Sequence, residues 1–291
     1  MTNSLSLIAP AKLNLNLIII DKLENGYHSL ESDICFLNLY DEINMKISNF
    51  NEIVVSDKST FFLKDENILS RTLNYFNSEF NNNNKFNITL KKNIPVGAGL
   101  GGGSSDSATL LLGLRHFYNK NPYNSKKITI TQLKEIGLKI GSDVPACITG
   151  KSLKLSGIGE RLKKISVAKN YKFLLVYPNK ILSTKKVFNN FNLSNTNKSN
   201  PMFFNKIRIY NSLEFTSQSL EPEIKKILNI LKSFKKIIAF GMSGSGSSCF
   251  GIFNTTYDFI NDEMFKTLKT EKKYFIWHGN KKEFGYNRFL Y

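Results

Sequence analysis

Apolar and polar residues follow two different periods along the first half of the chain. Residues 11–17 alternate one by one, which predicts a half-buried strand running on into residues 18–20, and Asn25-Gly26 then predicts a turn. Apolar runs at 34–39, 43–47 and 86–90 predict further strands. Helical spacing predicts helices over 67–80, 104–117 and 131–140, and the Asn-rich run 81–84 predicts a surface loop.

The pattern starts again after Gly157. Strands are predicted at 173–177, 249–253 and 274–277, helices over 221–234 and 259–268, and a polar loop at 193–200. Two successive sets of mixed strands and helices indicate an α+β protein of two domains, with a predicted division into 1–157 and 158–291.

The composition is that of an ordinary globular protein. The 291 residues are 41% hydrophobic and 22% charged. No apolar run approaches the roughly 18 to 20 residues that cross a bilayer, and residues 1–10 lack the features of a signal peptide. We therefore expect a cytoplasmic protein with no membrane partner. Cys35, Cys147 and Cys249 lie far apart and outside any C-x-x-C spacing, which predicts reduced, mostly buried thiols.

The net charge is strongly positive. A formal charge of +17 and a pI of about 9.6 create a field that attracts polyanions. Nucleic acid, nucleotides and diphosphates all satisfy this description. An excess of solvated lysines in an Asn-rich and Lys-rich chain explains the charge equally well.

The strongest chemical signal is a glycine cluster between a predicted strand and a predicted helix. Residues 95–108, PVGAGLGGGSSDSA, contain five glycines followed by Ser104 and Ser105. Glycine allows positive φ and lets backbone N–H groups approach a ligand, while the start of a helix adds unpaired N–H donors and a positive dipole end. This arrangement predicts a cradle for an anion, whereas the alternative is a flexible turn with a serine helix cap.

Three common phosphate loops do not fit this cluster. Gly97-x-Gly99-x-x-Gly102 matches the dinucleotide fingerprint, but the acidic ribose partner expected ~20 residues later is missing from 114–124. No lysine follows as a Walker A loop requires, and Gly150-Lys151-Ser152 has Pro145 where the first glycine belongs. The His-Arg-Asp and Asp-Phe-Gly signatures of protein kinases are absent from the sequence.

Three motifs together resemble another family of phosphate-binding enzymes. PVGAGLGGGSS at 95–105 resembles the phosphate-binding motif of the galactokinase, homoserine kinase and mevalonate kinase superfamily, APAKLNL at 9–15 its first motif, and GMSGSGSS at 241–248 its third. They occur in the family's order and span almost the whole chain. The resemblance implies a two-domain small-molecule kinase with a first domain like ribosomal S5 domain 2, a C-terminal α/β sandwich and an active site in the cleft between them.

Further stretches are similar to the diphosphocytidyl-methylerythritol kinase subgroup. These are residues 10–14, residues 21–28 with their Gly-Tyr-His triplet, and IGSDVP at 140–145, whereas STKKVF at 183–188 only loosely resembles the subgroup's Pro-Thr-x-x-Val-Phe. Such enzymes transfer the γ-phosphoryl group of ATP to the 2-hydroxyl of 4-diphosphocytidyl-2-C-methyl-D-erythritol, in non-mevalonate isoprenoid biosynthesis. The resemblance therefore implies ATP as co-substrate, Mg²⁺, and small molecules as the partners of a monomer or homodimer.

The resemblance also implies two catalytic residues. Phosphoryl transfer requires that the reactants be positioned, that charge on the moving group be offset, and that a base be oriented at the attacking hydroxyl. Asp143 is expected to accept or orient the hydroxyl proton, and Lys12 to steady that carboxylate and the developing charge. Without the flanking motifs, the preferred interpretation of Asp143 is an Asx turn before Pro145, and that of Lys12 is a solvated lysine on a strand.

Binding residues are implied on both sides of the reaction. Asp106 is assigned no role, because a first-turn carboxylate suits the helix dipole but repels a nearby triphosphate. Ser105 is a candidate to reach phosphate or Mg²⁺, Asn67 lies near the adenine, and Tyr27 and His28 suit the cytosine ring. The nucleotide side comprises Asn67, Pro95, Gly97, Ala98, Gly99, Leu100, Gly101, Gly102, Gly103, Ser104 and Ser105, and the substrate side Asn14, Tyr27, His28, Asp143, Thr184, Phe188, Gly244 and Ser245.

Two alternatives stay open at this stage. A sister kinase of the homoserine or mevalonate type carries the same three motifs. A basic RNA-binding protein explains the charge, but the lysines are scattered and no aromatic-flanked RNP motif is present, so no nucleic-acid partner is expected.

Overall fold

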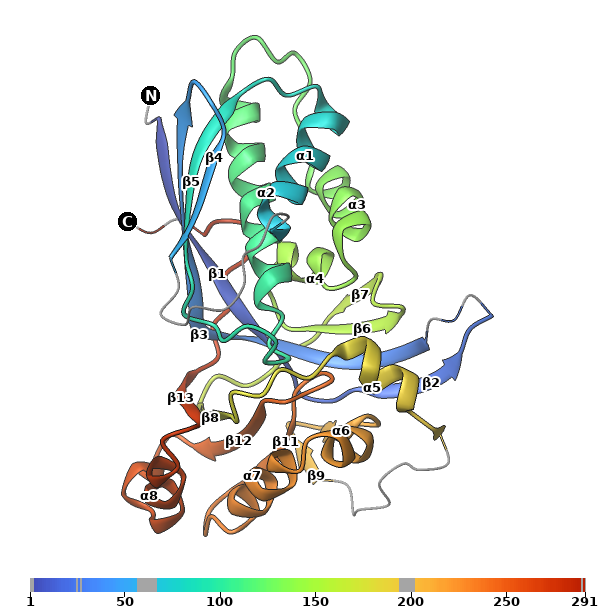
Figure 1. Ribbon diagram of the computed structural model, residues 1–291, viewed down its shortest axis with the longest axis vertical. Coiled ribbons are helices and arrows are strands. Elements are labelled where there is room, and N and C mark those ends of the chain that lie inside the picture. The colour runs from blue at the N-terminus through green and yellow to red at the C-terminus, as the bar shows by residue number, and fades with distance from the viewer. Residues whose placement is uncertain are drawn as a thin grey trace.

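A computed structural model describes residues 3–24, 26, 28–56, 67–193, 202–288 and 290. The strands of the first half form one sheet in the order β4-β5-β3-β6-β7, with β1 and β2 also paired to β3 (Figure 1). Only β4 and β5 run parallel among these pairs. The strands are β1 (Ser4–Asn14), β2 (Ile18–Lys22), β3 (His28–Ser48), β4 (Glu52–Ser56), β5 (Lys85–Lys91), β6 (Leu153–Gly157) and β7 (Arg161–Lys164).

The central strand β3 is 21 residues long and pairs with four other strands. It joins the two strands that the sequence predicts at 34–39 and 43–47. The polar break between them contains Asp41, whose carboxylate is fully buried and accepts the backbone N–H groups of Asn93 and Ile94 at 2.5 and 2.8 Å. Because these bonds satisfy the buried charge, the strand continues through this polar position.

Four helices cover one face of this sheet (Figure 1). They are α1 (Ile68–Phe80), α2 (Gly102–Lys120), α3 (Ile130–Ile140) and α4 (Val144–Thr149). Asn67 caps α1 by accepting the Ser70 N–H at 2.8 Å, and Thr129 forms a capping box with Gln132 at the start of α3. The buried side chains of Phe36, Phe76 and Phe86 belong to the core between sheet and helices.

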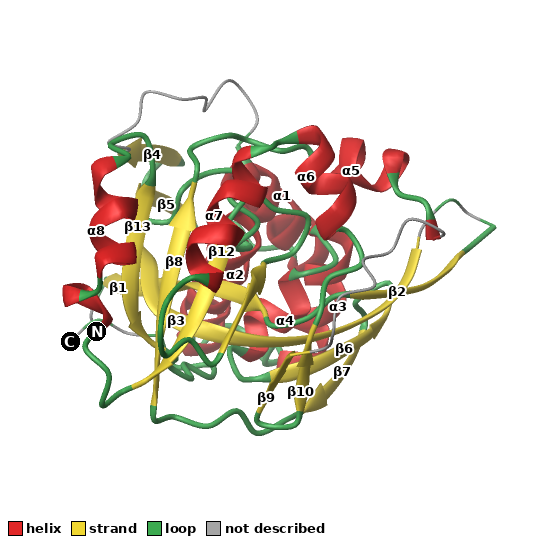
Figure 2. Ribbon diagram, turned by 90° about the horizontal axis from the view of Figure 1, so that it is seen from below, coloured by secondary structure: helices red, strands yellow, loops and turns green. Residues whose placement is uncertain are grey.

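The second half forms an antiparallel sheet in the order β11-β12-β8-β13. One face packs on β1 and β3, where Leu13 and Leu37 belong to the same core as Phe173 and Phe250. The opposite face, with Leu174 and its neighbours, is covered by α6, α7 and α8 (Figure 2). The elements are β8 (Tyr171–Tyr177), α5 (Thr184–Asn190), β9 (Met202–Phe204), β10 (Ile207–Ile209), α6 (Glu214–Leu220), α7 (Glu223–Lys232), β11 (Ala239–Met242), β12 (Cys249–Asn254), the 3₁₀ helix η2 (Phe259–Asn261), α8 (Glu263–Thr270) and β13 (Phe275–Asn280).

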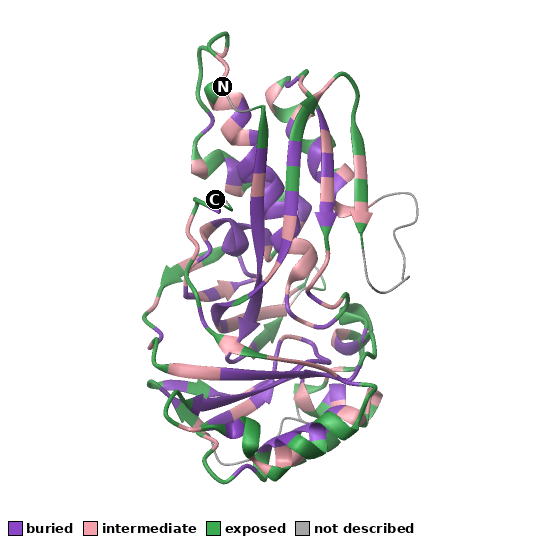
Figure 3. Cartoon of the chain, turned by 90° about the vertical axis from the view of Figure 1, so that its left-hand side faces the viewer, coloured by how far each residue is buried: buried purple, intermediate pink, exposed green. Residues whose placement is uncertain are grey.

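The two halves interlock beyond the predicted division at Gly157. β7 follows that point and pairs with β6 in the first sheet. The C-terminal tail also returns to the first sheet, because the Ile8 N–H donates to the Arg288 carbonyl and the Leu290 N–H to the Ser6 carbonyl, at 2.9 and 2.8 Å. Figure 1 accordingly shows both chain ends beside β1, and Figure 3 shows the buried residues concentrated on the strands between the layers.

The three cysteines are buried thiols, as their spacing in the sequence predicts. Cys35, Cys147 and Cys249 are unpaired and buried, and burial raises the pKa of the Cys35 and Cys147 thiols to about 12. Among the helices of the described residues, none has both the length and the apolar character needed to cross a bilayer.

Candidate active site

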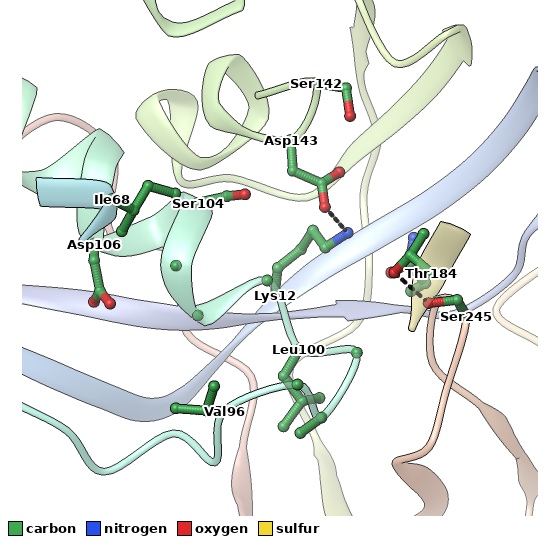
Figure 4. A pocket seen from close by; sticks show the side chains of 18 of the residues that line it. Lys12, Ile68, Val96, Leu100, Ser104, Asp106, Ser142, Asp143, Thr184 and Ser245 are labelled. Carbon is green, nitrogen blue, oxygen red and sulfur yellow. Dashed lines mark hydrogen bonds and ion pairs between the residues drawn. The ribbon is translucent and has the colours of Figure 1, made fainter. Parts of the chain in front are cut away.

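A cleft of about 500 Å³ opens where the two halves meet. It lies among the start of α2, the start of α4, strand β1, helix α5 and the second glycine loop, residues 241–248 (Figure 4). Most of the residues predicted for catalysis and binding line it: Lys12, Asn14, Asn67, Pro95, Gly97, Ala98, Gly99, Leu100, Gly101, Gly102, Gly103, Ser104, Asp143, Thr184, Phe188, Gly244 and Ser245.

An irregularity in β1 places Lys12 in this cleft. The pairing with β3 shifts between Pro10, which faces Tyr40, and Lys12, which faces Phe36. Such bulges re-aim side chains at active sites. At this shift the Lys12 N–H donates to the Leu100 carbonyl, at 2.8 Å, instead of to β3. The backbone of β1 therefore also holds the first glycine loop, residues 95–101.

Lys12 and Asp143 form an ion pair on the floor of the cleft. The Lys12 Nζ lies 2.7 Å from the Asp143 Oδ2, and their side chains are 5% and 34% exposed. Asp143 directly precedes α4, but its carboxylate makes no capping hydrogen bond, so it is not used by an Asx turn before Pro145. The pair therefore presents a carboxylate to the cleft, held in place by a cation that is almost buried (Figure 4).

The first glycine loop presents the start of α2 to the same space. Gly97, Gly99 and Gly101 adopt φ of +70°, +74° and +62°, values that L side chains rarely adopt. Gly101 is the helix cap and provides no side-chain bond, which leaves the N–H groups of the first turn available. A helix of 19 residues also directs the positive end of its dipole at this point. The loop is built to hold an anion.

The two glycine loops are in direct contact. The Ser243 hydroxyl donates to the Gly99 carbonyl at 3.0 Å and accepts the Asn14 N–H at 3.1 Å. The Ser248 N–H donates to the Ala98 carbonyl at 3.1 Å. The second loop is therefore a packed element of the cleft, which the alternation of Gly and Ser alone does not distinguish from a flexible linker.

Two segments of the chain match known kinase domains. Residues 67–151 match the family described as GHMP kinases N terminal domain, and residues 198–263 match GHMP kinases C terminal. A 4-diphosphocytidyl-2-C-methyl-D-erythritol kinase of Pseudoalteromonas translucida is 33% identical over 252 residues, which cover 87% of this chain and 85% of the relative. An enzyme of the same name from Clostridium perfringens is 33% identical over 290 residues, covering 91% and 94%. The chain belongs to the 4-diphosphocytidyl-2-C-methyl-D-erythritol kinase family.

Solved structures agree with this family. A crystal structure of a 4-(cytidine 5'-diphospho)-2C-methyl-D-erythritol kinase superposes with a TM-score of 0.75 at 25% identity, over 96% of this chain and all of that one. A mevalonate kinase shares the fold, with a TM-score of 0.68 at 16% identity over 96% and 100%. The family and the two-domain α+β kinase fold predicted from the motifs are thus confirmed.

Phe188 lines the cleft, whereas His28, which was predicted for the same side, does not line it and packs behind Phe188 instead. The His28 and Phe188 rings lie 5.1 Å apart, and Phe191 contacts His28 edge-on at 6.0 Å. Burial lowers the pKa of His28, and nearby Lys22 lowers it further. Tyr27, the neighbour predicted to share this role, lies outside the described residues.

Polar side chains predicted for the substrate side also line the cleft. Asn14 is buried and donates its Nδ2 to the Ser32 hydroxyl at 2.7 Å, while its Oδ1 has no hydrogen-bond partner among the described residues. Thr184 and Ser245 share a hydrogen bond of 2.8 Å between their hydroxyls, which joins α5 to the second glycine loop. A buried amide oxygen without a partner is costly unless a ligand satisfies it, so Asn14 is well suited to accept a substrate hydroxyl.

Ser105 is the one described residue of the predicted nucleotide set that the structure does not bring into the cleft. It belongs to the first turn of α2 and is fully buried, and its hydroxyl has no partner among the described residues. Ser104 lines the cleft instead. Successive helical residues point about 100° apart, so the two neighbouring hydroxyls cannot both face the cleft once α2 begins at Gly102.

A group of residues to which the sequence assigned no role supports the cleft. Lys92 and Asp106 line it, and Lys92 bridges Asp106 and the buried Asp41. Ser243 joins the two glycine loops. Asp41 and Lys92 carry no motif, and no pattern in the sequence pairs them. Asn67 does line the cleft as predicted, but its Oδ1 is used to cap α1.

Proposed function

We propose that this protein transfers the γ-phosphoryl group of ATP to the 2-hydroxyl of 4-diphosphocytidyl-2-C-methyl-D-erythritol, in non-mevalonate isoprenoid precursor biosynthesis. The observation that carries the proposal is the Lys12–Asp143 ion pair of 2.7 Å, which lies in one cleft with the start of α2. The names of the relatives and the motifs that they share with this chain support the choice of substrate.

The nucleotide is placed by the first glycine loop. Its triphosphate lies against the unpaired N–H groups of the first turn of α2, where the helix dipole offsets its charge. The adenosine end lies toward Asn67, Ile68 and Leu90, which line the same cleft. This arrangement directs the γ-phosphoryl group toward Lys12 and Asp143.

The acceptor hydroxyl is oriented by Asp143. The carboxylate accepts the hydrogen bond of the 2-hydroxyl and takes its proton as the oxygen attacks phosphorus. Lys12 holds this carboxylate through its Nζ and places a positive charge beside the moving phosphoryl group. Because Lys12 is almost buried, water screens its charge less than it screens the charge of an exposed lysine.

The cytidine end of the substrate is placed at the His28 and Phe188 rings. An aromatic face and a ring N–H suit the face and the edge of a pyrimidine. The diphosphate lies against the backbone of the second glycine loop at Gly244 and Ser245, with Thr184 at its side. The Asn14 Oδ1 accepts a hydrogen bond from a hydroxyl of the erythritol.

The oxygen donors of the cleft fit Mg²⁺. This ion is held by one or two carboxylates together with nucleotide phosphates and water. Asp143 engages Lys12 through only one of its oxygens, and Figure 4 shows the Ser104 hydroxyl pointing to the same space. The described residues contain no group of three or more His, Cys, Asp or Glu at ligand distance, which suits an ion that arrives with its nucleotide. When bound, Mg²⁺ neutralises charge on the β- and γ-phosphates.

A coupled assay of ADP release tests the proposal. Purified protein with ATP, Mg²⁺ and the cytidyl substrate should release ADP, and phosphorus NMR should show a new monophosphate on the erythritol. Homoserine and mevalonate are the matched alternatives, and turnover with either but not with the cytidyl substrate would move the protein to a sister family. Salt-sensitive binding of RNA without any stabilisation by ADP would instead favour the RNA-binding alternative. The cytoplasmic location stays a prediction.

A further inference from the structure

A buried ion cluster lies beneath the phosphate loop. The Lys92 Nζ contacts the Asp41 Oδ2 at 2.5 Å and the Asp106 Oδ2 at 2.7 Å. The side chains are 9%, 0% and 2% exposed, respectively. Buried charges are costly to hold and are retained mostly where their geometry serves a purpose. The proposed mechanism assigns them none.

The cluster ties together the two ends of the loop. Asp41 also accepts the N–H groups of Asn93 and Ile94, at 2.5 and 2.8 Å, and so anchors the segment that enters the loop to β3. Asp106 stands in α2, just after the loop ends. Lys92 bridges these two anchors, and residues 95–101 lie between them in the chain.

The loop also rests directly on the cluster. A Cβ added to Gly102, the first residue of α2, would lie 3.5 Å from the Lys92 Nζ and 3.2 Å from an Ile94 methyl carbon. Both Lys92 and Asp106 line the cleft. The Lys92 ammonium and the Ile94 side chain therefore pack against the helix start that presents its N–H groups to the phosphates.

We propose that Lys92 and Asp106 are positioning residues for the nucleotide. They hold the two ends of the phosphate loop, residues 95–101, at a fixed distance from each other before ATP binds. Three glycines with positive φ make this loop costly in backbone entropy to order. The tether reduces the part of that cost that falls on ATP binding. The inference rests on the proposed function and adds the residues that preorganise its nucleotide site.

The charges in the cluster decide which variants are informative. Burial raises the pKa of the Asp106 carboxyl, and Lys92 lowers it less than burial raises it. Its Oδ1 has no hydrogen-bond partner among the described residues. Removing Lys92 alone leaves two carboxylates face to face, which endangers folding. Removing the Asp106 carboxylate instead leaves Lys92 paired with Asp41, and so cuts the tether without creating an unpaired charge.

The experiment compares Asp106→Ala, Asp106→Asn and a matched control. Glu42→Ala removes an exposed ion pair of 3.0 Å with Lys91, which is adjacent in sequence to the cluster but lies on the solvent side. We expect Asp106→Ala to raise KM for ATP about tenfold, with kcat and KM for the cytidyl substrate within about threefold of the wild type. Asp106→Asn keeps an acceptor for Lys92 and should recover most of the loss. Glu42→Ala should match the wild type.

A double variant separates positioning from direct contact with the nucleotide. If the two residues act as one tether, Lys92→Met added to Asp106→Ala should cause little further loss. Additive losses, an unchanged KM for ATP in Asp106→Ala, or equal increases in both KM values would overturn the inference. If the absence of a cooperative unfolding transition shows that Asp106→Ala is not folded, Asn93→Ala takes its place. This variant removes the hydrogen bond from the Asn93 side chain to the Tyr40 carbonyl, and it should raise KM for ATP about threefold.

Thermal stabilisation by ADP gives a readout that needs no turnover. The wild type should be stabilised by ADP, Asp106→Ala should lose most of that increase in Tm, and Glu42→Ala should retain it. A wild type that binds ADP but does not convert the cytidyl substrate would refute the proposed function while leaving this test intact. An ADP response in Asp106→Ala equal to that of the wild type would refute the tether alone.

Discussion

Gly99 lies where the two glycine loops pack closely together, and replacing it by alanine tests whether their contact matters. A Cβ at this position would lie 2.6 Å from the Gly246 carbonyl oxygen and 2.7 Å from that of Ser243. Both atoms belong to the backbone, so no side chain can rotate away. The loops must separate until these contacts exceed 3.0 Å.

Two costs add up in this variant. The first is the positive φ of +74°, which costs an L residue roughly 1–2 kcal/mol. The second is the separation of the loops, which strains the hydrogen bonds from Ser243 to Gly99 and from Ser248 to Ala98. Misplacement approaching 1 Å at a site of this kind costs up to about 10²-fold in rate. We therefore expect kcat/KM to fall between about 10- and 10²-fold.

Gly285→Ala is the matched control. Gly285 also has positive φ, at +61°, but a Cβ there would meet nothing closer than the Lys151 Cε at 3.9 Å. The Gly285→Ala variant therefore has only the cost of a positive φ, at a position that does not line the cleft. Urea unfolding measures the stability of both variants, and ADP release measures their kcat/KM. If Gly99→Ala and Gly285→Ala lose equal activity, the contact between the loops is not needed for catalysis and our reasoning is wrong.

Three further predictions concern other parts of the molecule. Asp143→Asn should lower kcat about 10²-fold or more with the ADP-induced increase in Tm unchanged, and retained turnover would show that the carboxylate is dispensable. Phe188→Ala removes the ring beside His28 and should raise KM for the cytidyl substrate about tenfold with KM for ATP unchanged; an equal change in both would contradict the placement of cytidine. Hydrogen bonds from Lys226, Tyr274 and Lys273 lower the pKa of Glu223 to about 2 from its usual 4.5. Because the folded pKa is the lower one, the stability that these bonds add is present above pH 4.5 and is lost as pH falls toward 2. Urea midpoints should fall more steeply between about pH 5 and pH 3 in the wild type than in Glu223→Gln, and parallel curves would count against this assignment.

Local signals in the sequence were sufficient for most helices and for the identity of the site. Asn67 caps the helix predicted at 67–80, and the glycine cluster leads directly into the next helix. Caps and glycines act within a few residues, so their effects can be read from neighbouring positions. The three motifs name Lys12 and both glycine loops, the stretch IGSDVP at 140–145 adds Asp143, and the fold brings all of them to one cleft.

Other features depend on partners distant in the chain, and only the tertiary structure decides them. Asp41 continues a strand rather than ending it because Lys92, 51 residues away, and two backbone N–H groups satisfy its charge. Ser104 rather than Ser105 faces the cleft because α2 starts at Gly102. Lys12 points at Asp143, 131 residues later, because β1 changes register beside it. The residue types needed for this chemistry are thus written in the sequence, whereas their directions follow from long-range packing and hydrogen bonds that no local pattern records.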